Sequence, residues 1–269
     1  MTIPKMFFEF STLRAEMPKE NILMLRLSRP EVRNALNTAM IRELGAVWTE
    51  LRQAAHDLRA VILTGEGSKA FCAGADLKEK YGMSADAWRA QHEILEDTMR
   101  AMISCPTPVL AAVNGAAFGG GLELTLASDF AYAVPEATFA FPETRLGIIP
   151  GAMGTQLLPR AVGLNRAKEI CLTGATFTAA EACEWGIINK VVDRRNLLDE
   201  IIVCAASIAA GAPIAITQIK RSLNATMSLD IVSGYHFEIE AYNVCVNSSD
   251  RDEGIRAFNE KRRPNFRGE

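Results

Sequence analysis

The sequence predicts an α/β fold in which strand-strand-helix units repeat and a helical region follows them. Two observations carry this prediction. Short apolar runs of strand length alternate with helix-length amphipathic stretches through the first ~190 residues. From residue 167 onward the pattern is almost wholly helical. No linker, fixed-period repeat or low-complexity tract interrupts the chain.

The first expected elements are strands at residues 7–13 and 22–27, with a polar turn around residues 18–21. A helix is expected to begin at Asn37, because five large apolar residues after it recur at helical spacing. These residues are Met40, Leu44, Val47, Trp48 and Leu51.

Two buried strands are expected next, at AVILTG (60–65) and PVLAAVN (108–114). Between them lie a loop, FCAGADLKEK (71–80), and a helix expected over residues 85–104. The run FGGGLEL (118–124) then opens a helix, and short strands are expected in DFAYAV and ATFAFPE, the second ending at Glu143. A passage rich in glycine and proline, LGIIPGAMGTQ (146–156), leads into the helical region.

Composition excludes several classes of protein. The 269 residues are 49% hydrophobic and 23% charged, with a mean hydropathy of +0.06, as expected for a globular protein with a large core. A net charge of -3 and a pI near 5.8 argue against nucleic-acid or anionic-membrane partners. The helix expected from residue 37 mixes both signs of charge and carries no basic stripe.

The cysteines and the apolar segments favour a cytoplasmic protein. Six cysteines without a C-x-x-C pair indicate neither a disulfide framework nor a zinc knuckle. The N-terminal segment lacks the apolar region of a signal peptide. The longest apolar stretch, residues 201–216, is broken by Gly211 and Pro213 and is shorter than the ~20 residues that a membrane span needs.

Common nucleotide, hydrolase and metal motifs are absent from the sequence. TGEGSKAF lacks the glycine that a P-loop places before its lysine, and no G-x-G-x-x-G or G-x-S-x-G occurs. His56, His92 and His236 lack the spacing of metal ligands, so no metal site is expected.

The three glycines of FGGGLEL suggest a binding site for negative charge. Glycines at a helix N-terminus leave backbone N–H groups accessible, and the helix dipole favours an anion there. Without a P-loop lysine, that anion could equally be an oxyanion formed only during a reaction. The loop CAGAD (72–76) also follows a buried strand and could direct further N–H groups at the same oxygen.

Two glutamates accompany these loops. Glu123 lies in the first turn of the glycine-opened helix, and Glu143 follows Pro142. Two carboxylates near one oxyanion site could hold a water molecule and divide acid and base duties. Taken singly, each could equally be an ordinary carboxylate in a helix turn or a loop.

Five ordered segments resemble the crotonase (enoyl-CoA hydratase/isomerase) superfamily: LSRPEVRNALN (27–37), AFCAGADLKE (70–79), AAVNGAAFGGGLELTLASDFAYA (111–133), FPETRLGIIPG (141–151) and DRDEGIRAFNEKRRPNF (250–266). The resemblance implies a crotonase-like spiral core at 1–193 and a C-terminal helical region for oligomerisation at 194–269. It implies hydration of a trans-2-enoyl-CoA to a 3-hydroxyacyl-CoA, with no cofactor besides the coenzyme A of the substrate.

The resemblance also implies roles for particular residues. The N–H groups of Ala75 and Gly120 would stabilise the thioester enolate. Glu123 would assist water activation, and Glu143 would exchange the proton at C2. The residues implied to bind the acyl-CoA are Arg33, Ala35, Ala73, Ala75, Asp76, Leu77, Lys78, Gly120, Gly151, Phe258 and Lys261.

Phe258 and Lys261 match positions that reach the coenzyme A of a neighbouring subunit. The resemblance also implies that the C-terminal helical region builds a homotrimer or a homohexamer. Met153 and Leu157 stand where the family usually has glycine and arginine. The acyl pocket is expected over residues 81–95, including Met83, Trp88 and His92, and carries no signature of chain length.

Other activities remain open at this stage. The segments FCAGADLKE and EKRRPNFRGE are most similar to the sequences of methylglutaconyl-CoA hydratases. The dicarboxylic substrate of those enzymes would require a cation in the acyl pocket, such as Lys80, Arg89 or Arg145. An enoyl-CoA isomerase is a further alternative, as is a non-catalytic protein that binds acyl-CoA or RNA.

Overall fold

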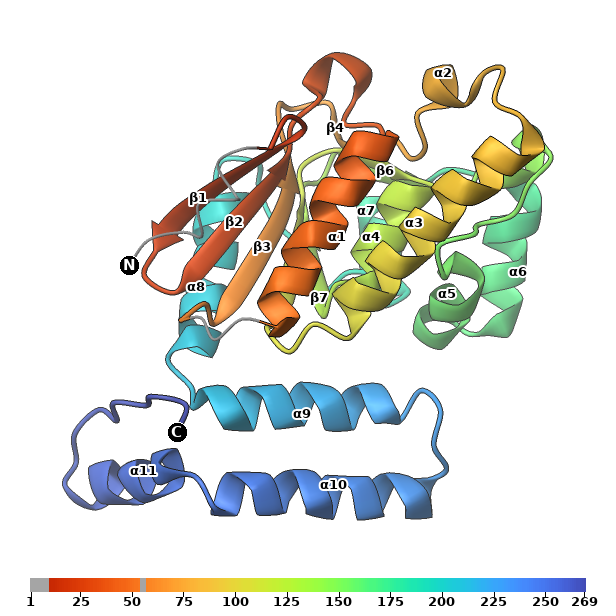
Figure 1. Cartoon of the computed structure of the whole chain (residues 1–269). Helices are drawn as coiled ribbons and strands as arrows, with labels where there is room; N and C mark the ends of the chain where they lie inside the picture. Colours follow the sequence, from red (N-terminus) through yellow and green to blue (C-terminus); the bar gives the residue numbers. More distant parts are fainter. Residues whose placement is uncertain (1–9, 54–56) are drawn as a thin grey trace.

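Two β-sheets, joined by a repeated strand-strand-helix unit, form the body of the protein. The computed structural model describes residues 10–53 and 57–269. The first unit gives both of its strands to the larger sheet, whereas each of the next three gives one strand to each sheet before its helices begin. Figure 1 shows the course of these units from the red to the green part of the chain. The predicted α/β spiral of such units, followed by C-terminal helices, is confirmed.

Within residues 10–53 and 57–269, the larger sheet has six strands in the order β1-β2-β3-β5-β7-β10. Only β1 runs antiparallel to its neighbour, and all other neighbours are parallel. β3 and β5 are buried along their whole length, which explains their continuous apolar sequences. The strands are β1 (Leu13–Lys19), β2 (Ile22–Leu27), β3 (Ala60–Gly65), β5 (Val109–Val113), β7 (Phe130–Ala133) and β10 (Lys190–Val191).

The smaller sheet has, in the described part of the chain, four strands in the order β4-β6-β8-β9, of which the last pair is antiparallel. They are β4 (Ala70–Cys72), β6 (Ala116–Phe118), β8 (Thr138–Ala140) and β9 (Phe177–Thr178). Each follows a strand of the larger sheet closely, except β9. The ends of β4 and β6 therefore lie side by side and direct the chain into α2 and α4.

The helices of the body follow their strands. They are η2 (Pro30–Val32), α1 (Thr38–Gln53), α2 (Leu77–Lys80), α3 (Ala85–Ile103), α4 (Gly120–Ala127), η3 (Glu143–Leu146), α5 (Gly154–Val162), α6 (Leu164–Thr173) and α7 (Ala179–Glu184). The predicted core face of α1 is confirmed, because all five of its expected apolar residues are buried. The Asn37 side chain caps this helix by accepting from the N–H of Met40.

Four expectations need correction. The strand expected at residues 7–13 falls partly outside the described residues, and of those described only Leu13 is in a strand. That strand, β1, runs on to Lys19, so the turn expected around residues 18–21 is confined to Glu20 and Asn21. Pro18 is tolerated in β1 because the strand lies at a sheet edge. The expected loop 71–80 contains most of β4 and all of α2, and the late helical region also holds β9 and β10. Strands of two or three residues are too short to show a period.

The C-terminal helices are α8 (Leu197–Ala209), α9 (Pro213–Ala225), α10 (Ile231–Val246) and α11 (Ser249–Asn259). α8 packs across β1, β2, β3, β5 and β7. α9 and α10 pack against each other and extend away from the body with α11 (Figure 1). Among the described residues no single helix is long and apolar enough to span a membrane, although the pair α8 and α9, bent by 106°, passes that test when joined.

Gly121 fixes the approach of α4 to β4. A Cβ added at Gly121 would lie 2.1 Å from the carbonyl oxygen of Cys72. We therefore expect Gly121→Ala to lower the free energy of unfolding by about 1–3 kcal/mol, the usual cost of overpacking, in urea denaturation. Gly234→Ala in α10, where an added Cβ has no atom of the described residues within 4 Å, is the matched control. Equal stability of both variants would contradict this account of the packing.

Candidate active site

One cavity of about 1100 Å³ brings together Ala75, Gly120, Glu123 and Glu143. Its walls come from the loop after β4, the first turn of α4, one face of α3 and the passage at residues 146–156. The four residues that the sequence singled out for chemistry therefore face a common space, although as many as 68 positions separate them in the chain.

The backbone of the loop at Ala75 is held by a single parallel bridge to Leu36. The N–H of Leu36 donates to the carbonyl oxygen of Gly74 at 2.8 Å, and the N–H of Asp76 donates to the carbonyl oxygen of Leu36 at 2.9 Å. In a parallel bridge, the residue between those two bonded positions directs its own N–H to the opposite side. The N–H of Ala75 thus points away from Leu36.

The second donor is the N–H of Gly120, the first residue of α4, which has no partner within its own helix. Close packing brings it beside the first donor. A Cβ added at Gly74 would lie 2.8 Å from the carbonyl oxygen of Phe118 and 3.5 Å from the nitrogen of Gly120. Only a glycine at position 74 lets the two backbones approach so closely.

The three consecutive glycines each serve a different contact. Gly119 adopts φ +50°, and a Cβ there would lie 2.7 Å from Oε1 of Glu143. A Cβ added to the backbone at Gly120 would lie 2.8 Å from the Leu36 side chain, and Gly121 meets β4. A side chain at Gly119 would displace Glu143, one at Gly120 would displace Leu36 of the cavity wall, and one at Gly121 would push α4 away from β4.

Glu123 is buried, with 3% of its surface exposed. Its Oε1 accepts from the N–H of Ala152 at 2.7 Å and from the N–H of Gly154 at 2.9 Å. Burial raises the pKa of Glu123 to about 7, the two N–H donors partly oppose this rise, and the charge of Glu143 adds to it. This carboxyl can therefore exchange a proton near neutral pH.

Glu143 does not end a strand, as the sequence had suggested, but opens the short 3-10 helix η3. It is 7% exposed, and its Oε2 has no hydrogen-bond partner among the described residues. Burial raises the pKa of this carboxyl as well. Because the charge of Glu143 also raises the pKa of Glu123, ionisation of one carboxyl makes ionisation of the other less favourable.

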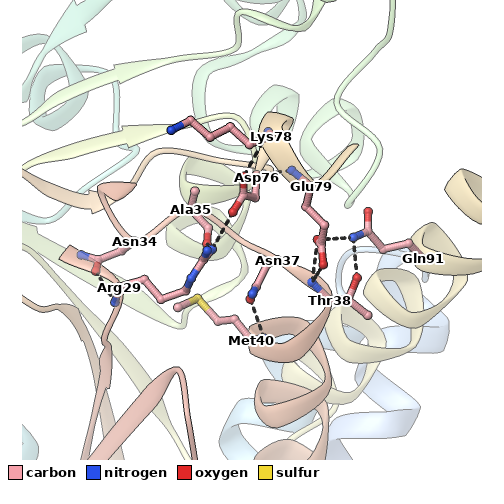
Figure 2. Close-up of polar contacts among 10 residues, drawn as sticks. All are labelled: Arg29, Asn34, Ala35, Asn37, Thr38, Met40, Asp76, Lys78, Glu79 and Gln91. Atoms are coloured by element: carbon pink, nitrogen blue, oxygen red, sulfur yellow. Dashed lines mark hydrogen bonds and ion pairs between the residues drawn. The ribbon is translucent and has the colours of Figure 1, made fainter. Parts of the chain in front are cut away.

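A network of polar contacts joins the segment after β2 to the loop after β4 (Figure 2). Arg29 forms a largely buried ion pair with Asp76 at 2.8 Å and also donates to the carbonyl oxygen of Ala35. Asp76 also caps α2 by accepting from the N–H groups of Lys78 and Glu79. Asp76 lies next to Ala75, so these contacts fix the position of the first donor.

The same network continues to α1 and α3. The Glu79 carboxylate accepts from the N–H of Thr38 at 2.9 Å, and the Gln91 amide donates to Glu79 and to the Thr38 hydroxyl, both at 2.7 Å. Arg29, Glu79 and Gln91 were not identified from the sequence. The one available signal was Asp76 followed three positions later by Glu79, which is the pattern of a helix cap.

The remaining predicted binding residues divide into two groups. Ala73, Leu77 and Gly151 line the cavity. The cavity lining found in the described part of the chain does not include Arg33, Ala35, Asp76, Lys78, Phe258 or Lys261. Arg33 and Lys78 are exposed and free of ion pairs with other described residues, and Phe258 is 83% exposed.

The expected acyl pocket is present only in part. Trp88 and His92 of α3 line the cavity, whereas Tyr81 and Met83 are not part of the lining that the described residues form. Of the three candidate cations, Lys80 and Arg89 line the cavity and Arg145 is not part of that described lining. Lys80 lies 3.8 Å from the centre of the Trp88 ring, and Arg89 pairs with Asp86 at the surface.

Known proteins are similar to this chain in sequence and in architecture. The family model described as "Enoyl-CoA hydratase/isomerase" matches residues 18–269. A crotonyl-CoA hydratase of Syntrophomonas wolfei is 38% identical over 92% of this chain and 95% of that protein. A short-chain-enoyl-CoA hydratase of Clostridium acetobutylicum is 37% identical over 90% of this chain and 92% of that protein. The crystal structure of an enoyl-CoA hydratase from Bacillus anthracis superposes with a TM-score of 0.93 and 40% identity, covering 96% of this chain and all of that one.

The raised pKa of Glu123 predicts a dependence of stability on pH. The folded protein keeps this proton up to about pH 7, whereas the unfolded chain releases it near 4.5, so this group lowers the free energy of unfolding as the pH rises between those values. The expected loss is about 3 kcal/mol, at ~1.4 kcal/mol for each pKa unit. Glu123→Gln removes the charge, so it should lose correspondingly less stability between pH 5 and pH 8 in urea denaturation.

The control for this measurement is Glu20→Gln, in the exposed turn after β1. It should keep the pH dependence of the unchanged protein. If Glu123→Gln also kept it, then Glu123 would not titrate near neutral pH.

Proposed function

The chain belongs to the enoyl-CoA hydratase/isomerase family, and from that premise we propose that it adds water to a trans-2-enoyl-CoA to give a 3-hydroxyacyl-CoA. The observation that carries this proposal is the pairing of two buried glutamates with two backbone donors around one cavity. Water addition needs one group to take a proton from water, another to give a proton to carbon, and donors for the charge that develops between these events.

The thioester oxygen would lie between the N–H groups of Ala75 and Gly120. As hydroxide adds to C3, electron density moves through C2 onto this oxygen, and both donors then stabilise an enolate. Each donor of this kind typically contributes ~2.7–4 kcal/mol to the transition state. The two donors belong to packed backbone rather than to side chains, so they need little reorganisation during the reaction.

The water molecule would lie between Glu123 and Glu143. Glu123 is held through Oε1, which leaves Oε2 to accept a proton from the water as its oxygen bonds to C3. Glu143 would give its proton to C2 as the enolate collapses. The C2–C3 double bond is consumed, one O–H bond of water breaks, and C3–O and C2–H bonds form. One proton exchange then returns the glutamates to their starting state.

Coenzyme A would bind across the loops outside the cavity. Arg33 and Lys78 are exposed there and are free of ion pairs with other described residues, so both are available to phosphate groups. Ala35 and residues 73–77 would contact the rest of the carrier. Every step above uses protein groups and water alone, so we propose no cofactor beyond the coenzyme A of the substrate.

We propose that the chain assembles as a homotrimer or as a dimer of trimers. Exposed apolar residues form a stripe along α10, at Ile231, Val232, Tyr235, Ile239 and Tyr242. Phe258 is likewise exposed on α11. Together with Lys261 it would cover the coenzyme A that is bound to a neighbouring subunit. We also propose a cytoplasmic location, which the six free cysteines support.

The proposed assembly can be tested by light scattering after size-exclusion chromatography. The unchanged protein should have three or six times the mass of one chain. Tyr235→Glu combined with Ile239→Glu should lower that mass, because burying two carboxylates in an apolar interface is costly. Glu20→Lys, in the distant turn after β1, should leave it unchanged. A monomeric unchanged protein would contradict the proposal.

Hydration itself is tested by the loss of conjugated-enoyl absorbance when the protein is added to crotonyl-CoA. Glu123→Gln and Glu143→Gln should each lower the turnover by ~10²–10⁴, the usual contribution of a positioned acid or base, while coenzyme A still binds. The distant Glu20→Gln variant should keep full turnover. Unaltered turnover in either glutamate variant would reject the role assigned to that residue.

Other outcomes would identify the alternatives. Conversion of a 3-enoyl-CoA to a 2-enoyl-CoA without water addition would indicate an isomerase. Hydration of a dicarboxylic enoyl-CoA in preference to crotonyl-CoA would indicate a methylglutaconyl-CoA hydratase, with Lys80 as the cation in the cavity. Saturable binding of crotonyl-CoA without turnover of any of these compounds would indicate a binding protein.

A further inference from the structure

Met153 adopts a backbone conformation that methionine rarely takes. Its φ is +75° and its ψ is +4°, the left-handed region that glycine enters freely and other residues enter at a cost. The same passage places a glycine, Gly147, at its other position with this conformation (φ +72°, ψ +23°). A methionine here is therefore an exception to the local pattern, and it lies at the active-site cavity.

The hydrogen bonds of Glu123 explain why the backbone turns at this point. The N–H groups of Ala152 and Gly154 converge on one oxygen, Oε1 of Glu123, at 2.7 and 2.9 Å. Backbone N–H groups converge on an anion in this way when a right-handed residue is followed by a left-handed one. The turn is thus required to hold Glu123, but a glycine at position 153 would make it without strain.

The side chain of Met153, and not its backbone conformation, must therefore explain why a methionine occupies this position. Ala152 and Gly154 on either side are buried, whereas Met153 is 37% exposed and lines the cavity. Leu95 and Met99 of α3, together with Ile148 and Ile149, provide further apolar lining. A flexible thioether side chain is well suited to filling such an irregular apolar space.

This part of the cavity is the part available to an acyl group. The exposed residues assigned to coenzyme A, Arg33 and Lys78, are not among the lining residues in the described chain, whereas the face of α3 and residues 146–156 are. The part of an acyl chain beyond C3 would extend away from the two glutamates and lie along these walls. Met153 lies on that path, one residue from each of the groups that hold Glu123.

We propose that Met153 is a specificity-determining residue, whose side chain occupies acyl space beside Glu123 and restricts the site to short enoyl groups. This inference rests on the proposed function, and it adds the substrate class that the same site accepts. Long straight-chain enoyl groups are excluded because the methionine takes the volume that their carbons past C4 would need.

The test compares crotonyl-CoA with trans-2-octenoyl-CoA as substrates for the unchanged protein, Met153→Ala and Met153→Gly. Alanine removes the side chain but keeps the left-handed strain, whereas glycine removes both. Both variants should raise kcat/KM for octenoyl-CoA relative to crotonyl-CoA by about tenfold or more, the size that hydrophobic pocket contacts give. Asn21→Gly changes another left-handed residue, in the turn after β1, and should leave the ratio unchanged.

Calorimetric binding of the saturated butyryl-CoA and octanoyl-CoA separates this inference from the proposed function. If the protein hydrates neither enoyl-CoA, the proposed function fails, yet Met153→Ala should still bind octanoyl-CoA more tightly relative to butyryl-CoA. An unchanged ratio in both methionine variants, in turnover and in binding, would overturn the inference. A change in Met153→Gly alone would also overturn it, because the cause would then be backbone strain and not side-chain volume.

Discussion

The close approach of two backbone segments, at Gly74 and at Gly119 to Gly121, is the constraint on which the site depends. An added Cβ at any of these positions would come within 3 Å of another atom. Tight packing of this kind places the N–H groups of Ala75 and Gly120 beside each other without any side chain. The spiral makes the approach possible, because β4 and β6 are neighbours in the smaller sheet and end at the same edge.

The two carboxylates of the site, unlike its closely packed glycines, cost the fold stability. Glu123 and Glu143 are buried where neither can ionise without cost, and the Glu143 oxygen that has no partner among the described residues adds to that cost. The body offsets the cost of burying these carboxylates with a large apolar core. It also offsets it with the polar network of Arg29, Asp76 and Glu79, which joins the segment after β2, the loop after β4 and the start of α1. The two carboxyl groups whose burial costs stability are therefore also the ones placed for proton transfer.

The sequence was sufficient for the long elements and for the four residues at the centre of the cavity. α1, α3, β3 and β5 carry strong periodicity or long apolar runs, and the glycine run next to Glu123 has a direct physical meaning. It was insufficient for β4 and β6, whose three residues cannot show a period. Contacts such as Arg29 with Asp76 join positions far apart in the chain, and nothing local marks them. The left-handed turn at Met153 was also hidden, because methionine is not a residue from which such a turn is predicted.

The most direct test of the account measures how strongly the two backbone donors polarise the thioester. The C=O stretching frequency of carbonyl-labelled crotonyl-CoA would be recorded by infrared difference spectroscopy on the Glu123→Gln, Glu143→Gln double variant, which should bind the ligand without consuming it. The account predicts a clear shift of the bound carbonyl to lower frequency than in water, since two preorganised N–H groups donate to it. A bound carbonyl with the same frequency as in water would contradict the central claim that Ala75 and Gly120 form the oxyanion site.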